Sequence, residues 1–152
     1  MSSMEVLLLQ KKIADYPERI DKMQKRYGMI MAPRSSEISS AIKGLNSYML
    51  QLKVNRGSFA KLKQEIDQDV ARLQALEGNL DRTKELSESI RLSVVQVMHA
   101  KATTETYLAS IDAQIDGAVT AKEKLELAQK QKKTVDVINL LTMIQNGDGY
   151  KL

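Results

Sequence analysis

The feature that most constrains this chain is a narrow line of large apolar side chains separated by three or four residues. Residues 58–80 read SFAKLKQEIDQDVARLQALEGNL, and the apolar line consists of Phe59, Leu62, Ile66, Leu73, Leu76 and Leu80. Alternating steps of three and four place these side chains along one side of a helix, as in a coiled-coil heptad. Only neighbouring helices can remove so narrow a line from water. We therefore expect contacts between helices to determine the structure.

Composition favours the same conclusion. Among 152 residues there are six aromatic residues, no Trp, two Pro and seven Gly, so long stretches lack helix breakers. Alternating β-branched and aromatic clusters between turn signals are missing, which argues against a largely β fold. The sequence predicts an all-α fold, an elongated coiled-coil or helical-hairpin rod with long amphipathic helices.

The pattern divides the chain into four predicted segments. Residues 1–34 form an N-terminal amphipathic helix and a Pro-containing loop, and residues 35–57 form a second helix. Residues 58–133 form a long coiled-coil helix or hairpin, and residues 134–152 form an apolar C-terminal helix and a loose tail. Pro17 removes an amide donor inside the first segment, so we expect a kink or a restart near Asp15 to Pro17. Ser35 or Ser36 is expected to cap the helix after Pro33.

Two places in the pattern leave the path of the chain open. At residues 55–58, NRGS, the apolar frame changes phase, which indicates either a turn or a stutter in a continuous helix. From Phe59 the new frame continues to about Ala100, a helix on the order of 60 Å long at roughly 1.5 Å per residue. Lys101 and Thr104 then fall on the seam, so residues 100–104 are either a tight turn or part of an unbroken helix.

The predicted partner-binding seam closes either by hairpin formation or by pairing with other chains. Asp69 and other polar residues on the seam are expected to fix its register or to mark positions that are not buried. The seam residues are Phe59, Leu62, Ile66, Leu73, Leu76, Leu80, Ile90, Val94 and Val97.

The C-terminal run VDVINLLTMI carries a broader apolar stripe than a two-position seam. Its members are Val137, Ile138, Leu141 and Ile144. We predict that this docking stripe enters a groove on a partner or closes one end of a bundle. Packing on the chain's own N-terminal EVLLL helix is the alternative.

The basic excess lies near the N-terminus, where residues 1–34 hold seven basic and four acidic side chains. A phosphate-binding or anionic-lipid face is one interpretation, and a solvated face of an amphipathic helix is the other. The basic residues are Lys11, Lys12, Arg19, Lys22, Lys25, Arg26 and Arg34.

The sequence offers little for catalysis. It has no Cys and one histidine, His99, so no metal-ligand spacing is recognisable, and we expect no cofactor. Nucleophile-elbow, zinc-protease, Walker and dinucleotide motifs are absent from the sequence. The NGDG near the end lacks the spacing and the closing Glu of a calcium loop. We predict that the protein is not an enzyme.

These observations favour a structural or adaptor subunit that assembles by coiled-coil packing with itself or with partner proteins. Protein helices are the expected partners, in an oligomer or a multi-subunit assembly. The alternatives are a module that binds polyanions, such as nucleic acid, or an anionic membrane surface, and a helical chaperone for an exported protein. Val6 to Leu9 is too short an apolar run for a signal peptide or a membrane span. A cytoplasmic protein is therefore expected.

Overall fold

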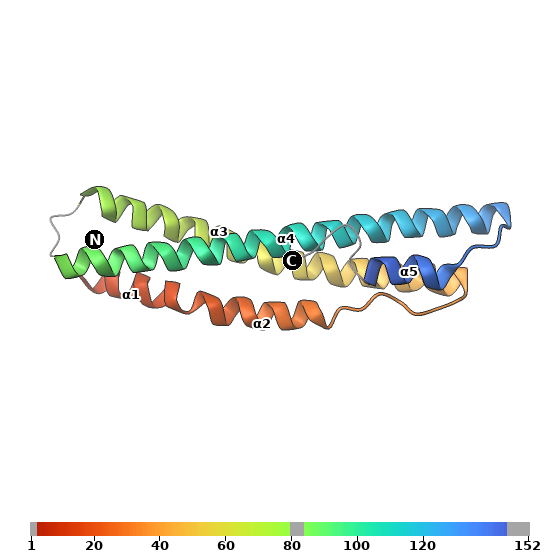
Figure 1. Cartoon of the computed structure of the whole chain (residues 1–152), viewed down its shortest axis with the longest axis horizontal. Coiled ribbons are helices and arrows are strands. Elements are labelled where there is room, and N and C mark those ends of the chain that lie inside the picture. The colour runs from red at the N-terminus through yellow and green to blue at the C-terminus, as the bar shows by residue number, and fades with distance from the viewer. Residues whose placement is uncertain (1–2, 80–83, 146–152) are drawn as a thin grey trace. The chain divides into compact units, whose positions relative to one another are not determined.

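The computed structural model describes residues 3–79 and 84–145, which form five helices (Figure 1). They are α1 (Ser3–Ala14), α2 (Tyr16–Gly28), α3 (Ile38–Asn79), α4 (Lys84–Gln131) and α5 (Val137–Gln145). These described ranges contain no β-strand. The predicted all-α fold class is confirmed.

The break between α1 and α2 follows from Pro17. Helix α1 ends at Ala14 and α2 begins at Tyr16, which confirms the predicted restart. Proline has no backbone N–H and fits the first turn of a helix better than its interior. The backbone N–H of Arg19 donates to the carbonyl oxygen of Asp15 at 3.2 Å and so starts the new helix.

The loop between α2 and α3 ends as the sequence predicts. The Oγ atom of Ser35 accepts a hydrogen bond from the backbone N–H of Glu37 at 3.2 Å. The loop also lies against α3, because a Cβ atom added at Gly44 would be 2.9 Å from Cγ of Pro33 and closer still to its Cβ. Glycine at this position therefore permits a close approach of loop and helix.

Helix α3 runs without interruption through residues 55–58, so of the two alternatives there the turn is excluded and the helix is continuous, and the predicted end of a second helix at residue 57 is wrong. The phase change is also absent from the burial pattern. Buried side chains follow steps of three and four throughout α3, because two polar residues, Asn55 and Asp69, occupy core positions. The members of this single frame are Leu45, Tyr48, Leu52, Asn55, Phe59, Leu62, Ile66, Asp69, Leu73 and Leu76.

Helix α4 is unbroken through residues 100–104, so the predicted alternative of a continuous helix is confirmed and that of a tight turn is excluded. Of the two forms predicted for residues 58–133, a long helix or a hairpin, the structure has the hairpin, so the single helix from Phe59 to about Ala100 is wrong: α3 ends at Asn79, and α4, which begins at Lys84, pairs with it in antiparallel orientation. The buried frame of α4 is rich in small and polar residues. It includes Ile90, Ser93, Val97, Ala100, Thr104, Ile111, Ala118, Ala121, Leu125 and Ala128.

The chain divides into two compact units. Unit 1 contains α1, α2 as far as Gln24, α3 from Ser58 onward, and α4 as far as Thr106. Unit 2 contains residues 25–57, which include the N-terminal part of α3, together with α4 from Tyr107 and α5.

In unit 1, α3 and α4 pack in antiparallel orientation. The Nζ atom of Lys63 lies 4.0 Å from Glu105, and Nζ of Lys101 lies 3.4 Å from Asp67, so residue numbers rise on one helix as they fall on the other. Helix α1 lies beside both: it is tied to α3 by an ion pair described below, and Nε2 of Gln10 donates to Oγ of Ser89 on α4 at 2.6 Å. The core of unit 1 is thus enclosed by α1, α3 and α4, each of which contacts the other two.

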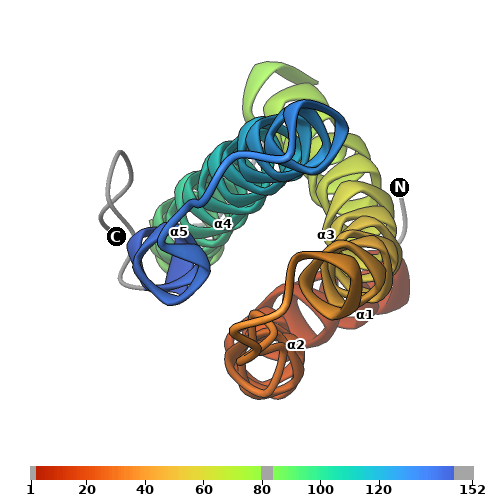
Figure 2. The same cartoon turned by 90° about the vertical axis from the view of Figure 1, so that its right-hand side faces the viewer.

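In unit 2, the last turn of α2 is fixed on α4 by Tyr27. Its hydroxyl lies 2.8 Å from Oγ of the buried Ser110, and its ring meets the ring of Tyr107 edge-on, with centroids 6.0 Å apart. Figure 2 shows the loop that leads from α4 back to α5. Ile144 of α5 packs on α4 beside Gly117. A Cβ atom added at Gly117 would lie 3.9 Å from Cγ1 of Ile144.

Candidate protein-binding surface

The predicted partner-binding seam is the core of unit 1. Seven of its members are buried by helices of the same chain, namely Phe59, Leu62, Ile66, Leu73, Leu76, Ile90 and Val97. Val94 is only half-buried, because the α4 frame passes through Ser93, and Leu80 lies outside the described residues. Side chains enclosed in this way are not accessible to another protein while the fold is intact. Hairpin formation, the first of the two predicted alternatives, closes the seam.

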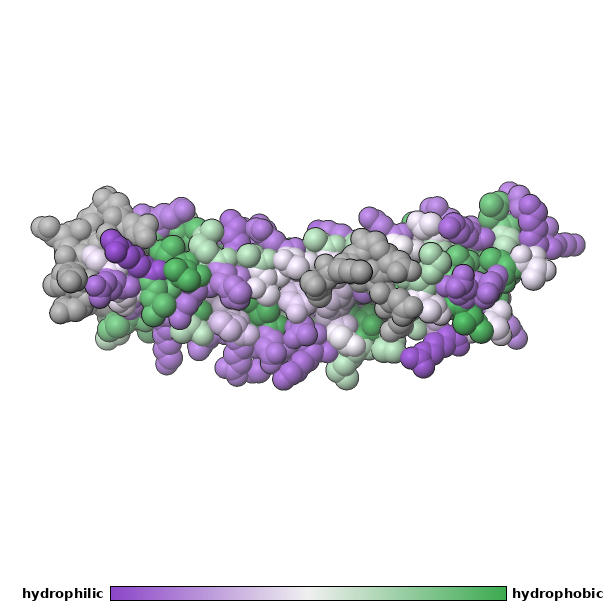
Figure 3. Space-filling view, in the orientation of Figure 1, coloured by the Kyte–Doolittle hydropathy of each residue, from purple (hydrophilic) through white to green (hydrophobic). Residues whose placement is uncertain are grey.

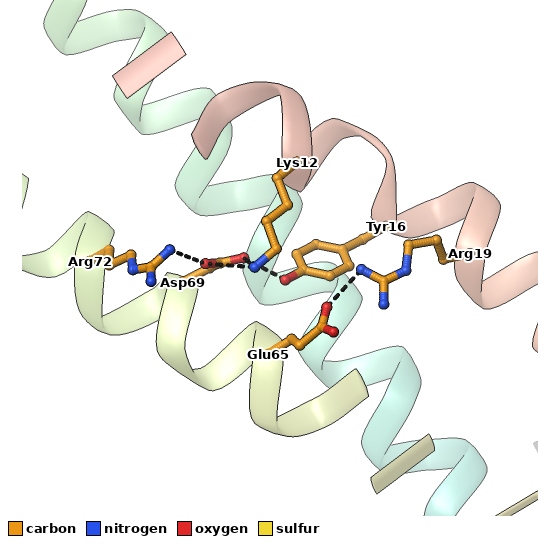
Figure 4. Close-up of polar contacts among 6 residues, drawn as sticks. All are labelled: Lys12, Tyr16, Arg19, Glu65, Asp69 and Arg72. Atoms are coloured by element: carbon orange, nitrogen blue, oxygen red, sulfur yellow. Dashed lines mark hydrogen bonds and ion pairs between the residues drawn. The ribbon is translucent and has the colours of Figure 1, made fainter. Parts of the chain in front are cut away.

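A buried carboxylate interrupts this apolar core. Asp69 has no exposed side-chain surface, and three groups surround it (Figure 4). The hydroxyl of Tyr16 donates a hydrogen bond to it, Nζ of Lys12 lies 3.2 Å from Oδ2, and Nη1 of Arg72 lies 3.5 Å from Oδ1. A buried carboxylate requires such partners, since removal from water disfavours its charge.

The environment of Tyr16 suppresses its ionisation. Burial is the main cause, and the hydrogen bond to Asp69 the second, of a pKa of the Tyr16 phenol that lies far above its ordinary value. One turn further along α2, Nη1 of Arg19 lies 2.7 Å from Oε2 of Glu65, and its guanidinium lies over the Tyr16 ring, 5.5 Å from the centroid. The hydrogen bond from Arg19 lowers the pKa of Glu65. Together these contacts set the register of α1 and α2 on α3.

Three of the seven residues of the predicted basic face pair with carboxylates of the same chain. Lys12 pairs with Asp69, Arg19 with Glu65, and Lys22 with Glu18 at 3.5 Å. Lys11 and Arg26 are exposed, as are Lys25 and Arg34. Lys11, Lys12, Arg19 and Lys22 belong to unit 1, whereas Lys25, Arg26 and Arg34 belong to unit 2.

The C-terminal docking stripe is mostly enclosed within unit 2. Val137, Leu141 and Ile144 are buried, whereas Ile138 is 59% exposed. Ile144 lies against α4 at Gly117, so this end of the stripe packs on a helix of its own unit. Ile138 and Leu141 also line a cavity of about 520 Å³, together with residues 33–36 of the loop before α3.

Unit 1 exposes large apolar side chains, and on α4 two further uncharged residues beside them, that its own fold leaves uncovered. On α1 they are Met4, Leu7 and Leu8, which we call the α1 outer face. On α4 the exposed residues are Leu92, Val95, Met98, His99 and Ala102, which we call the α4 outer face. Figure 3 shows hydrophobic side chains gathered over the N-terminal part of α4. Exposed apolar groupings of this kind commonly mark protein interaction sites.

Sequence reasoning missed the α4 outer face. It placed Val94 on the seam, one residue away from the buried Ser93. The available signal was the run from Leu92 to Ala100, which holds more apolar residues than a two-position seam requires. The α1 outer face was not predicted either, because the EVLLL segment was expected only to pack on the C-terminal stripe.

Other kinds of site find no support in the part of the chain that the structure describes. No group of three or more His, Asp or Glu side chains there could hold a metal ion. His99, the one histidine, is exposed on α4. Within those same ranges, no helix has the length and apolar character that crossing a membrane requires.

Comparisons of this chain with family models, with curated proteins and with solved structures found no match.

Proposed function

We propose that the protein is a non-enzymatic assembly subunit whose helices bind helices of other protein chains. The binding surface in this proposal is the outer side of unit 1, formed by the α1 outer face and the α4 outer face. One observation carries the proposal: α4 buries Ser93 and Thr104 but exposes Leu92 and Val95. Burial of apolar surface is the main driving force for association of helices in water.

The α1 outer face also borders a cavity into which a partner side chain could fit. A cavity of about 430 Å³ lies between α1 and α3, lined by Leu8 and Leu9 with Lys12 and Arg72 among its walls. An apolar side chain of a partner helix that entered this cavity would bury Leu8, which is exposed in the free chain. Helix recognition of this kind uses anchors spaced by three, four and seven residues.

A polyanion-binding or membrane-binding function has less support. Three of the basic side chains expected to bind phosphate are already paired with Asp69, Glu65 and Glu18. Binding through Lys12 or Arg19 would require breaking contacts that hold α1 and α2 on α3, whereas the pair of Lys22 and Glu18 lies within α2. The helical chaperone alternative has no observation in its favour that the assembly proposal lacks.

The proposal is tested by purifying the tagged full-length protein from its native cells. The wild type is compared with Leu7→Glu/Leu8→Glu, which charges the α1 outer face, and with Leu50→Glu/Val54→Glu on α3 as a matched control. Leu7 is 61% exposed and Leu50 is 64% exposed, so neither change disturbs a core. We expect protein partners to be lost with the α1 variant and retained with the control. Identical partners for all three proteins would exclude the α1 outer face as the binding surface.

A further inference from the structure

The α4 outer face is uncharged over about three turns in a chain that is 28% charged. Between Arg91 and Glu105, the only charged residue is Lys101. Lys101 is turned toward α3, with Nζ 3.4 Å from Asp67. What remains on the outside is apolar or neutral, with Leu92 60%, Val95 66% and Met98 45% exposed.

The spacing of this face is that of a second helix-packing seam. Leu92, Val95, His99 and Ala102 are separated by steps of three, four and three. Each lies two residues beyond a residue of the buried frame, Ile90, Ser93, Val97 and Ala100, and therefore on roughly the opposite side of the helix. Helix α4 thus has one seam directed into unit 1 and another directed outward.

The two ends of the face carry opposite charges. Arg91 at its N-terminal end is exposed and forms no ion pair with any residue that the structure describes. Glu105 at its C-terminal end has a side chain that is 48% exposed, and its contact with Lys63 is long, at 4.0 Å. Both charges can therefore interact with a chain packed on this face.

We propose that the α4 outer face binds the same face of a second copy of this chain, with the two α4 helices antiparallel about a two-fold axis. In that register, Leu92 faces Ala102 of the second copy and Val95 faces His99 of the second copy. Arg91 lies beside Glu105 of the second copy, and the symmetry repeats each contact. Flanking pairs of opposite charge are the usual determinant of orientation in coiled coils.

The charge pattern selects this occupant. An anionic membrane or nucleic acid would need a cationic face, and the α4 outer face is neutral between its ends. A parallel second copy would place Arg91 beside Arg91 and Glu105 beside Glu105. An antiparallel copy joins each charge to its opposite and leaves no like charges adjacent.

The interface is small. About three to four turns of one helix pair fall at or below the low end of specific interfaces, which bury about 1,200 Å² in total. We therefore expect a dimer with a Kd in the micromolar range or weaker. This inference deepens the proposed function and rests on it, since it names a second copy as one of the chains that unit 1 binds.

Sedimentation equilibrium of the full-length protein over a range of concentrations tests the dimer. The mass of the wild type is expected to rise from one 17.1 kDa chain toward twice that value. Val95→Glu places a charge at the centre of the face and should abolish the rise. Val54→Glu is the control, because Val54 is also 66% exposed but lies on α3, and it should dimerise like the wild type. Circular dichroism verifies that both variants are folded.

A charge exchange tests the orientation. Arg91→Glu alone and Glu105→Arg alone each create two like-charge pairs in the homodimer and should weaken it by about tenfold or more. An equal mixture of the two variants restores opposite charges at both ends and should form a dimer close to the wild type in affinity. A mixture as weak as its components would overturn the antiparallel pairing.

The outcomes separate this inference from the function on which it rests. A wild type that stays monomeric at all concentrations, or a dimer that Val95→Glu does not affect, overturns self-pairing through α4. Either result leaves the binding of partners through Leu7 and Leu8 to be decided by the purification from native cells. Loss of those partners without any change in the dimer would support both proposals.

Discussion

Removing the buried carboxylate of Asp69 should destabilise the protein mainly through the group it leaves behind. In Asp69→Ala the hydroxyl of Tyr16, which is fully buried, loses its acceptor, at a cost of about 1–3 kcal/mol. Lys12 and Arg72 are 38% and 55% exposed and can turn to water, so they add little. The small void left by the side chain adds about 1 kcal/mol. We expect a total of about 3 kcal/mol.

Substitution of the hydrogen-bond donor Tyr16 should lower the free energy of unfolding by less than substitution of Asp69. In Tyr16→Phe the carboxylate of Asp69 keeps Lys12 at 3.2 Å and Arg72 at 3.5 Å, so only one hydrogen bond is lost, about 1 kcal/mol. The double variant leaves no buried hydroxyl without an acceptor. Its free energy of unfolding should therefore lie above that expected from the sum of the two single changes, by about 1–2 kcal/mol.

Urea unfolding followed by circular dichroism measures the free energy of unfolding of the wild type, the two single variants and the double variant, which together form a double-mutant cycle. Asp116→Ala is the control, since Asp116 is exposed and its removal should change stability by less than about 0.5 kcal/mol. Additive effects of the two changes would refute the reasoning. So would a larger loss for Tyr16→Phe than for Asp69→Ala, because it would place the main cost on the carboxylate.

Three further predictions use the same unfolding assay. Gly44→Ala should lower the unfolding midpoint because its Cβ collides with the preceding loop, whereas Gly57→Ala, with open space around it, should gain about 1 kcal/mol; equal effects would contradict the close packing. The raised pKa of Tyr16 favours the neutral phenol in the folded state, so stability should be full below about pH 10 and fall as pH rises above it; a fall of the same size in Tyr16→Phe would contradict this. The lowered pKa of Glu65, caused first by its hydrogen bond from Arg19, predicts stability that is present above about pH 4.3 and lost as pH falls; Glu65→Gln should flatten this dependence, and an unchanged profile would argue against the contact.

The helical class and the main breaks near the N-terminus were predictable because they depend on local chemistry. Pro17 cannot donate a backbone hydrogen bond, and Ser35 can accept one next to a helix start. Such effects act over one or two turns and do not depend on the rest of the chain. For this reason the restart after Asp15 appears where the sequence indicates it, and the Ser35 side chain bonds the backbone of Glu37 directly before α3.

The register of α3 was not predictable because polar residues occupy core positions. Asn55 is buried, so a pattern drawn from apolar residues alone loses phase at that residue. Asp69 is accommodated by Tyr16 and Lys12, which lie more than 50 residues away in the sequence. A pattern of apolar residues along one helix contains no information about such distant partners.

The end of the long helix predicted from Phe59 raises a similar difficulty. The heptad frame can be drawn past Gly78, and a single glycine costs a helix only about 1 kcal/mol. Folding back allows α3 and α4 to bury both seams against each other, with Lys63 near Glu105 and Lys101 near Asp67. This gain depends on contacts between distant residues, so local propensity does not reveal it.

The candidate binding surface shows most clearly what a single helix pattern leaves undetermined. On α4, the apolar run from Leu92 to Met98 supports two frames that differ by one residue. Apolarity alone favours the frame through Val94, but the structure buries Ser93 and leaves Val95 exposed. The frame through Val94 would bury an apolar side chain in place of Ser93 and remove more apolar surface from water, but both frames keep Ile90 and Val97 in the core and leave Leu92 and Val95 outside it. Because unit 1 buries neither Leu92 nor Val95, we assign these outward side chains to contact with another helix.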